Sequence, residues 1–416
     1  MSAARLLDRR QMLRRIGGAM ALAAPAVLAG RALAASRPAL SAGLPDGVYA
    51  SAAMEALPGK KPLIKLSYRP PNYETPIAYL DQAITPNDAF FVRYHLADIP
   101  TAIDAGQWKI KVGGEGAASP FELGVDELRN GFEPVEVAAV CQCSGNRRGF
   151  SEPHVPGVQW GVGAMGCAVW RGARLKDVLA KAGLRKEAIE IVVDGADGPV
   201  LDKTPDFVKS LPVWKALDEN TLIAYTMNGA PLPHWNGAPV RLVVPGWTAT
   251  YWMKHLVSIE AATKPFAGFW MKSAYRIPTG KFPLVQHFET QVTETSEPIT
   301  EMVVNSLITA PEPGHKSRAG APIELRGIAW DGGYGIRRVE VSSDEGKTWR
   351  AASLGKDGGR FAFRSWRFSF TPPRAGSYQL RARASNGLGQ TQADALIFNP
   401  AGYHNNVARP LAIVVT

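Results

Sequence analysis

The sequence predicts an α+β protein with a mixed helix and strand domain followed by an immunoglobulin-like β-sandwich. Three observations predict this. The 416 residues are enough for two or three domains. Helical and strand-like patterns alternate irregularly over residues 75–265, and short runs of alternating apolar and polar residues follow after residue 298. With 46% hydrophobic and 20% charged residues, the composition is that of a globular chain rather than a disordered or polytopic membrane protein.

Residues 1–34 read as an export signal. Basic residues around Arg9-Arg10-Gln-Met-Leu precede a short Ala-rich apolar stretch, and Ala32-Leu-Ala34 offers the small residues of a cleavage site. The Arg-Arg pair followed by x-Met-Leu resembles a twin-arginine signal, which implies export of an already folded protein. The apolar stretch is too short for a membrane span. We therefore expect a periplasmic protein with no membrane span in its mature form.

Export would also remove half of the net charge. The full chain carries +10 at pH 7, and residues 1–34 contain six Arg and one Asp, which leaves 41 basic and 36 acidic residues. The remaining excess is modest and does not predict a nucleic-acid partner.

The larger domain is predicted over residues 75–298. Residues 35–74, rich in Pro, Gly and Lys, read as an extended lead-in without periodicity. Within the domain, residues 189–193 and 240–244 read as strands and residues 174–182 as a helix. Its last part, from residue 266, is irregular and rich in aromatic side chains.

The sandwich is predicted over residues 299–416. Runs at residues 323–330, 338–342, 361–370 and 378–384 alternate apolar and polar residues, and turn signals such as Asn386-Gly387 separate them. About seven short strands over such a length are typical of an immunoglobulin-like sandwich.

The chain has three cysteines, Cys141, Cys143 and Cys167. An odd number excludes a disulfide framework as the purpose of these residues. A bridge between Cys141 and Cys143 is possible but would be strained at a spacing of one residue. At least one thiol is therefore expected to have a chemical role. No Cys-x-x-Cys-His motif is present, so no covalent c-type haem is predicted.

Three short motifs carry residues suited to a soft metal and an anion. Cys143-Ser-Gly-Asn-Arg-Arg places a thiol beside two guanidinium groups, whose charge favours a thiolate. Residues 90–95 carry Arg93 and His95 two positions apart on an expected strand, hence on one face. Residues 244–255 form a Gly- and Thr-rich turn that ends in a lysine and a histidine. Each motif alone is also compatible with a purely structural role in a core or on a surface.

Together and in this order, the motifs resemble the sulfite oxidase family of molybdenum enzymes. The resemblance covers most of the chain after residue 68 and includes further matches at residues 84–87, 170–179, 224–233 and 239–246. Residues 327–330 and 341–349 resemble the dimerisation domain of the family. The resemblance thus implies a sulfite-oxidase-type molybdopterin domain followed by a sandwich domain that pairs two copies into a homodimer.

The resemblance implies a molybdenum atom bound by the dithiolene of one molybdopterin and by one protein thiolate, Cys143. Cys141 is the competing ligand, and Cys167 matches no ligand position. Because the pterin carries a phosphate, its site needs cations and backbone donors. The family pattern assigns cofactor binding to Phe91, Val92, Arg93, Tyr94, His95, Asp197, Asn236, Arg241, Trp252, Met253 and Lys254. At Asn236 and Trp252 the sequence departs from animal relatives.

The implied substrate, sulfite, is a small oxyanion that a guanidinium fork can bind. The resemblance assigns this role to Arg93 and Arg148. It also assigns a hydrogen bond to substrate to the Tyr275 hydroxyl, and tuning of the network to His95. Arg364 matches an arginine that some relatives project into the pocket, although it can equally be an outward-facing strand residue.

The implied activity is oxidation of sulfite to sulfate. The length left after the signal and two domains has no room for a haem domain, so we expect an external electron acceptor, a periplasmic c-type cytochrome. Two alternatives stay open: a molybdenum reductase of S- or N-oxides such as methionine sulfoxide, and a secreted binding protein without redox chemistry. The pair Arg93 and Arg148 opposes the first, and the Cys143 motif opposes the second.

Overall fold

The computed structural model describes Leu44, Val48 and residues 53–279 and 290–416, all within one compact unit, Arg37–Thr416. The predicted export signal, residues 1–34, lies outside the described residues. No helix among the described residues is long and apolar enough to cross a membrane.

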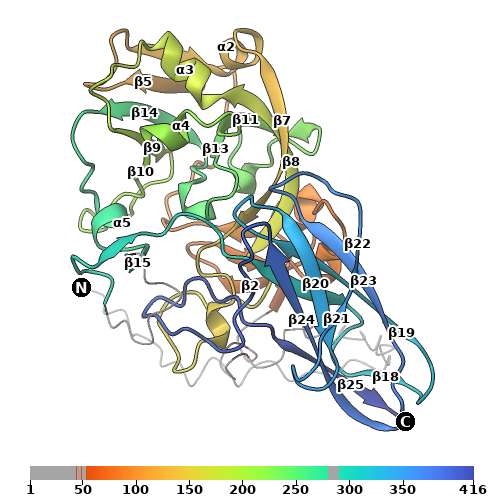
Figure 1. Cartoon of the computed structure of the whole chain (residues 1–416). Coiled ribbons are helices and arrows are strands. Elements are labelled where there is room, and N and C mark those ends of the chain that lie inside the picture. Colours follow the sequence, from red (N-terminus) through yellow and green to blue (C-terminus); the bar gives the residue numbers. More distant parts are fainter. Residues whose placement is uncertain (1–43, 45–47, 49–52, 280–289) are drawn as a thin grey trace, which may run out of the picture. The chain divides into compact units, whose positions relative to one another are not determined.

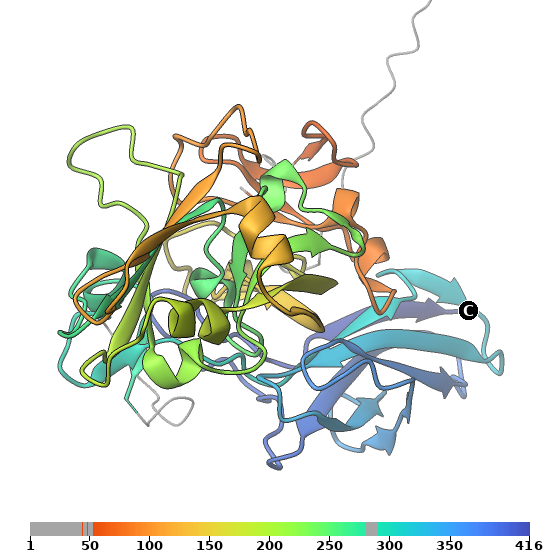
Figure 2. The same ribbon diagram turned by 90° about the horizontal axis from the view of Figure 1, so that it is seen from above.

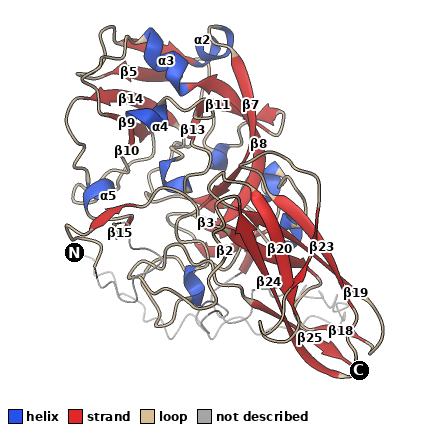
Figure 3. Ribbon diagram, viewed as in Figure 1, coloured by secondary structure: helices blue, strands red, loops and turns tan. Residues whose placement is uncertain are grey.

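The larger domain contains two five-stranded sheets (Figures 1 and 3). The first has the strand order β10-β9-β14-β5-β6 and consists of β5 (Lys109–Gly113), β6 (Phe121–Gly124), β9 (Glu190–Gly195), β10 (Lys209–Pro212) and β14 (Leu256–Ala262). The second consists of β7 (Pro134–Gln142), β8 (Met165–Arg174), β11 (Leu222–Met227), β12 (Ala230–Pro231) and β13 (Arg241–Val243). The predicted mixed α+β class is confirmed.

The helices of this domain are short. They are α2 (Val125–Asn130), α3 (Leu175–Lys181), α4 (Val213–Ala216) and α5 (Phe269–Lys272), with 3-10 turns η1 (Ile77–Leu80), η2 (Asn87–Ala89), η3 (Arg148–Phe150), η4 (His234–Asn236) and η5 (Ala249–Tyr251). In α3, Leu175, Val178 and Leu179 are buried, because their spacing places them on one helical face. This is the helix that the sequence predicts.

The described part of the predicted lead-in belongs to the larger domain. Strands β1 (Ala53–Glu55), β2 (Leu63–Ser67) and β3 (Asn72–Glu74) form a sheet with β4 (Val92–Arg93). In this sheet Asn72 pairs with Arg93, and Tyr73 pairs with Val92. Local periodicity does not reveal these strands because they are short, three to five residues each.

The C-terminal domain is a sandwich of a four-stranded and a five-stranded sheet (Figure 2). The order is β17-β19-β23-β22 in one sheet and β18-β25-β24-β20-β21 in the other. The strands are β17 (Asn305–Ala310), β18 (His315–Ser317), β19 (Ile323–Trp330), β20 (Ile336–Ser342), β21 (Arg350–Ala351), β22 (Ser353–Leu354), β23 (Arg364–Phe370), β24 (Gly376–Asn386) and β25 (Pro410–Val415). A further pair, β15 (Arg276–Pro278) and β16 (Ser296–Pro298), precedes the sandwich. The predicted sandwich is confirmed.

The sandwich packs against the strands that flank the Cys143 motif. One apolar cluster contains Val140, Met165 and Cys167 of the larger domain together with Ile328, Trp330 and Phe363 of the sandwich. The Trp330 indole donates a hydrogen bond to Gln142 Oε1 at 2.6 Å. Cys167 is therefore a buried core residue between the domains.

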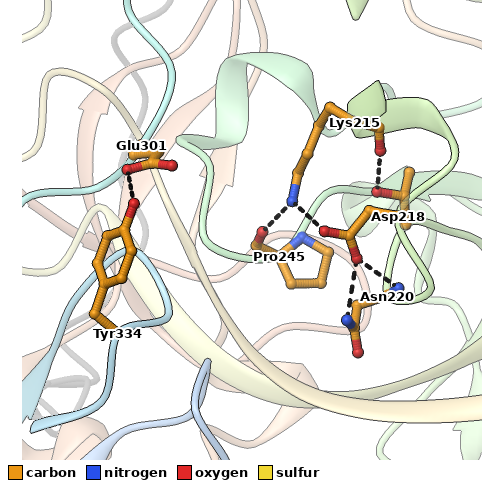
Figure 4. Close-up of polar contacts among 7 residues, drawn as sticks. Lys215, Asp218, Asn220, Pro245, Glu301 and Tyr334 are labelled. Atoms are coloured by element: carbon orange, nitrogen blue, oxygen red, sulfur yellow. Dashed lines mark hydrogen bonds and ion pairs between the residues drawn. The ribbon is translucent and has the colours of Figure 1, made fainter. Parts of the chain in front are cut away.

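A buried lysine supports the turn that leads into residues 244–254. Lys215 Nζ lies 3.1 Å from the Pro245 carbonyl oxygen and 3.2 Å from Asp218 Oδ2 (Figure 4). The same view shows Tyr334 of the sandwich, whose hydroxyl donates to Glu301 at 2.6 Å. The hydrogen bond from Lys215 stabilises the backbone at Pro245, ahead of the predicted cofactor-binding residues 252–254.

Glu74, at the end of β3, supports the loop that faces the Cys143 motif. Its buried carboxylate accepts hydrogen bonds from the backbone N–H groups of Gly161 and Gly163, both at 2.8 Å. The Gly161 carbonyl in turn accepts a hydrogen bond from the Arg147 N–H at 2.8 Å. Burial raises the pKa of Glu74 to about 7.

We expect Glu74→Gln to lower the free energy of unfolding by about 1–3 kcal/mol, because an amide nitrogen would face a backbone N–H and leave a buried donor unpaired. Urea denaturation at pH 5 measures the change, because the raised pKa of Glu74 keeps its carboxyl neutral there and the substitution removes no buried charge. Glu122→Gln, at an exposed position of β6, is the control and should shift the free energy by less than about 0.5 kcal/mol. Equal stability of the two variants would contradict the role of Glu74.

Candidate active site

A cavity in the larger domain brings together most of the predicted site residues. Its volume, including the open space at its mouth, is about 610 Å³. Several segments far apart in the sequence supply its lining. The predicted residues that line it are Phe91, Arg93, His95, Cys143, Asp197, Asn236, Arg241, Trp252, Met253, Lys254 and Tyr275.

Cys143 is the first residue after β7 and begins a tight turn. Its N–H donates to the Ala164 carbonyl at 2.9 Å, and its carbonyl accepts from the Asn146 N–H at 2.9 Å. Gly145 is required in this turn because a Cβ there would lie 2.4 Å from the Arg148 guanidinium. The Cys143 side chain is 6% exposed and lines the cavity. Its thiol is therefore positioned for a metal held in the cavity.

Cys141 also lines the cavity. Both predicted thiols are therefore near enough to the cavity to be the metal ligand. Arg241 Nη2 lies 4.0 Å from the Cys141 Sγ atom. Burial raises the pKa of the Cys141 thiol to about 11. Because a metal ligand must be a thiolate, this environment disfavours Cys141 as the ligand.

Buried cations line the part of the cavity assigned to the pterin. The Arg241 guanidinium lies 5.1 Å from the ring centroid of Trp170 and 5.7 Å from that of Trp252. Burial lowers the pKa of Lys254 to about 8, and the negative charge of Asp197 opposes this effect. A bound anion would favour the charged forms of both cations.

Polar atoms of this lining are left without partners. Within the described residues, Arg93 Nε, Ser144 Oγ, Arg241 Nε and Thr250 Oγ1 are buried and make no hydrogen bond. Such atoms are costly unless a ligand pairs with them. Together with the cations and the Cys143 thiol, they fit an anionic pterin that carries a soft metal.

Side chains alternate along residues 91–95. Phe91, Arg93 and His95 face the cavity, as the predicted spacing requires. Val92 and Tyr94 instead pack into an apolar cluster on the other side, so the structure does not bring these two predicted cofactor-binding side chains to the cavity. The alternation of an extended chain is the physical reason.

Asn236 lines the cavity, but its amide group is engaged by protein atoms. Its Oδ1 accepts a hydrogen bond from Lys60 at 2.5 Å, and its Nδ2 donates to the Phe91 carbonyl at 3.2 Å. Burial lowers the pKa of Lys60 to about 7. The polar atoms of Asn236 therefore support the wall of the cavity.

His95 and Tyr275 form a hydrogen-bonded pair between Nε2 and the phenolic oxygen. The His95 ring also stacks on Phe207, with ring centroids 3.6 Å apart. Burial, followed by the charge of Arg93, holds the pKa of His95 well below its usual range, so the imidazole is neutral at neutral pH. Burial raises the pKa of Tyr275, so the hydroxyl keeps its proton.

Arg148 lies behind the cavity lining. Its Nε donates to the Ala401 carbonyl at 2.7 Å and its Nη1 to the Val158 carbonyl at 3.1 Å. Its positive charge contributes to the lowered pKa of His95 and opposes the rise in the pKa of Tyr275. Arg148 thus acts on the predicted substrate site through its charge.

Arg364 is placed elsewhere. It begins β23 in the sandwich and forms an ion pair with Asp357 at 3.0 Å. It is absent from the side chains that line the cavity, which corrects the expectation that it enters the pocket. The strand pairing of β23 with β19 fixes it within the sandwich.

Sequence reasoning missed two aromatic residues of the site. Phe207, just ahead of β10, stacks on His95, and Tyr403 stacks on Tyr275 with ring centroids 5.4 Å apart. No local motif marks Phe207. For Tyr403, a signal exists in the Asn-rich run at residues 399–406, which interrupts the alternation of the sandwich.

Two family models match the chain in the predicted order. The oxidoreductase molybdopterin binding domain matches residues 96–270, and the Mo-co oxidoreductase dimerisation domain matches residues 296–413. Sulfite oxidase of Gallus gallus is 34% identical over 327 residues, which are 75% of this chain and 68% of that protein. The chain belongs to the sulfite oxidase family of molybdenum enzymes. The predicted molybdenum-molybdopterin cofactor is thereby confirmed.

Other similarities agree with this family. Human mitochondrial sulfite oxidase is 35% identical over 78% of this chain, which spans 60% of the length of that relative. The crystal structure of the sulfane dehydrogenase SoxCD from Paracoccus pantotrophus matches with a TM-score of 0.71 and 25% identity, over 83% of this chain and 85% of that one.

We expect Cys143→Ser to abolish the thiolate-to-metal absorption of protein purified with its cofactor, whereas Cys141→Ser retains it. The dithiolene sulfurs of the cofactor absorb as well, but the cysteine-to-metal band is present only with a protein thiolate as ligand, and Cys143 is the favoured one. Optical spectra together with molybdenum analysis check this. Loss of the band in Cys141→Ser alone would assign the ligand to the other thiol.

His255 contacts the strand that carries Arg93 and His95. Its Nδ1 donates to the Ala238 carbonyl at 2.6 Å, and its Nε2 accepts from the Tyr94 hydroxyl at 2.7 Å. The hydrogen bond from Tyr94 requires the neutral imidazole, because only an unprotonated Nε2 can accept a hydrogen. Burial lowers the pKa of His255 to about 3.

This pKa predicts acid sensitivity. The unfolded chain binds a proton at His255 near pH 6.5, but the folded chain does so only near pH 3. The free energy of unfolding therefore falls as pH decreases through this range, by up to about 1.4 kcal/mol per pH unit. Urea denaturation between pH 7 and 4.5 should show a shallower decline in His255→Asn and an unchanged one in His315→Asn, whose histidine is exposed. Equal slopes for all three proteins would disprove the assignment.

Proposed function

We propose that this protein oxidises sulfite to sulfate at its molybdenum-molybdopterin centre and passes the electrons to an external c-type cytochrome in the periplasm. The observation that carries the proposal is that Arg93, His95 and Tyr275 converge on the cavity that contains Cys143. The names of its relatives, sulfite oxidase and sulfane dehydrogenase, support a sulfur substrate.

When bound, the molybdenum centre supplies the two-electron oxidation and the transfer of oxygen. In the net reaction, sulfite and water give sulfate, two protons and two electrons. Arg93 binds the anion: its Nη1 is hydrogen-bonded to Asn72 at 3.0 Å, but its Nε has no partner among the described residues. Arg148 adds positive charge that does not have to rearrange during the reaction.

His95 and Tyr275 orient the anion. A neutral His95 with its proton on Nε2 donates to the Tyr275 oxygen, which leaves the phenolic hydrogen free to bond an oxygen of sulfite. The low pKa of His95 keeps the imidazole neutral beside the cationic residues. Phe207 fixes the plane of the imidazole by stacking on it.

Export and assembly complete the proposal. The twin-arginine-like sequence of residues 1–34 supports a periplasmic location. The dimerisation-domain match over residues 296–413 supports a homodimer.

The test is steady-state reduction of cytochrome c by sulfite, with molybdenum-loaded protein. We expect turnover with sulfite, and we expect Arg93→Met to raise KM for sulfite by about 10- to 150-fold, the equivalent of one charge-assisted hydrogen bond. Arg171→Met is the control, because Arg171 is exposed and pairs with Glu136 at 3.3 Å. Loaded protein that ignores sulfite but reduces methionine sulfoxide with an artificial electron donor would overturn the proposal.

A further inference from the structure

We propose that Tyr403, a residue of the sandwich domain, is a positioning residue for Tyr275 and thereby makes the sandwich domain part of the active site. The inference rests on the proposed function insofar as Tyr275 acts on the substrate. It assigns to the sandwich a role in catalysis besides the pairing of two chains.

The two tyrosines form a stacked pair inside the protein. Their ring centroids are 5.4 Å apart and their planes differ by 13°. Tyr403 is 5% exposed and Tyr275 is 6% exposed. The guanidinium carbon of Arg148 lies 5.6 Å from the centroid of the Tyr403 ring. Tyr403 is therefore in contact with both the tyrosine and one arginine of the proposed site.

The backbone of Tyr275 needs such support. Its φ angle is 57°, in the left-handed region that a bulky side chain rarely adopts. A conformation of this kind persists only where the surroundings hold it. His95 holds the Tyr275 hydroxyl, and the Ile299 N–H donates to the Tyr275 carbonyl at 2.8 Å. Tyr403 contacts the face of the Tyr275 ring.

Tyr403 is itself held firmly. The Asn399 side chain accepts a hydrogen bond from the Tyr403 N–H at 2.9 Å and donates one to its carbonyl at 2.8 Å. Two residues further on, the Asn405 side chain donates to the Arg147 carbonyl at 3.1 Å. Arg147 Nη1 donates to the Val407 carbonyl at 3.1 Å. The segment that carries Tyr403 is thus tied to the turn that carries Cys143.

Glycine at position 402 shows how closely this segment approaches Arg148. Gly402 has a φ of 60°, and a Cβ there would lie 2.9 Å from Arg148 Cγ. The carbonyl of the preceding residue, Ala401, accepts the hydrogen bond from Arg148 Nε. A displacement of the segment would therefore change the surroundings of Arg148 and Tyr275 together.

The test compares Tyr403→Leu, Tyr403→Phe and Tyr275→Phe in the sulfite assay. We expect Tyr403→Leu to lower kcat about 10- to 100-fold, the loss typical of a misplaced catalytic group. Tyr403→Phe keeps the stacked ring and should retain most of kcat. Tyr378→Leu is the matched control, because Tyr378 also packs on an aromatic ring of the sandwich, Phe370, and should leave kcat unchanged.

A double-mutant cycle separates positioning from a merely structural role. If Tyr403 acts through the Tyr275 hydroxyl, Tyr403→Leu has no further effect on kcat in the Tyr275→Phe background. Additive losses, or a kcat of Tyr403→Leu within twofold of wild type, would overturn the inference.

A crystal structure gives a readout that does not depend on the substrate. In Tyr403→Leu we expect the Tyr275 hydroxyl to lie beyond hydrogen-bonding distance of His95 Nε2, and in Tyr403→Phe to remain within it. An unmoved Tyr275 in Tyr403→Leu would overturn the inference. Wild-type protein that does not oxidise sulfite while Tyr275 moves as expected would reject the proposed function and leave the positioning role intact.

Discussion

The turn from Cys143 to Arg148 sets the constraint on which the rest of the structure depends. It must present a thiol to the cavity while two guanidinium groups stay buried behind it. Backbone carbonyls pair with both guanidinium groups. Arg147 donates to the carbonyls of Ser306 and Val407, and Arg148 donates to the carbonyls of Ala401 and Val158. A carbonyl satisfies a donor without cancelling its charge. Burial still lowers the pKa of Arg147, to about 9, but a positive field remains at the cavity.

The source of these carbonyls explains why the two domains are found as one unit. Ser306, Ala401 and Val407 belong to the sandwich, and Trp330 of the sandwich holds Gln142, directly ahead of Cys143. The catalytic turn is therefore assembled between the domains. A larger domain without its sandwich would lose these acceptors and expose to water the apolar surface of Val140, Met165 and Cys167.

Much of the site could be predicted because its chemistry lies in short motifs. The alternation along residues 91–95 correctly placed Arg93 and His95 on one face, and the Cys143 motif lines the same cavity. The same alternation, applied strictly, would also have removed Val92 and Tyr94 from the cofactor-binding set. Arg364 was misplaced because resemblance of a strand does not determine which of its side chains reaches a distant pocket.

The sequence by itself determined the order of the domains, the family and the residue types of the site, because these depend on local patterns and motifs. Only the tertiary structure decided that Phe207 stacks on His95 and that Tyr403 stacks on Tyr275. It also decided that the described lead-in strands join β4 and that carbonyls of the sandwich hold the two arginines. These contacts join residues far apart in the chain. Neither the spacing of residues nor the composition shows which distant side chains meet in a packed interior.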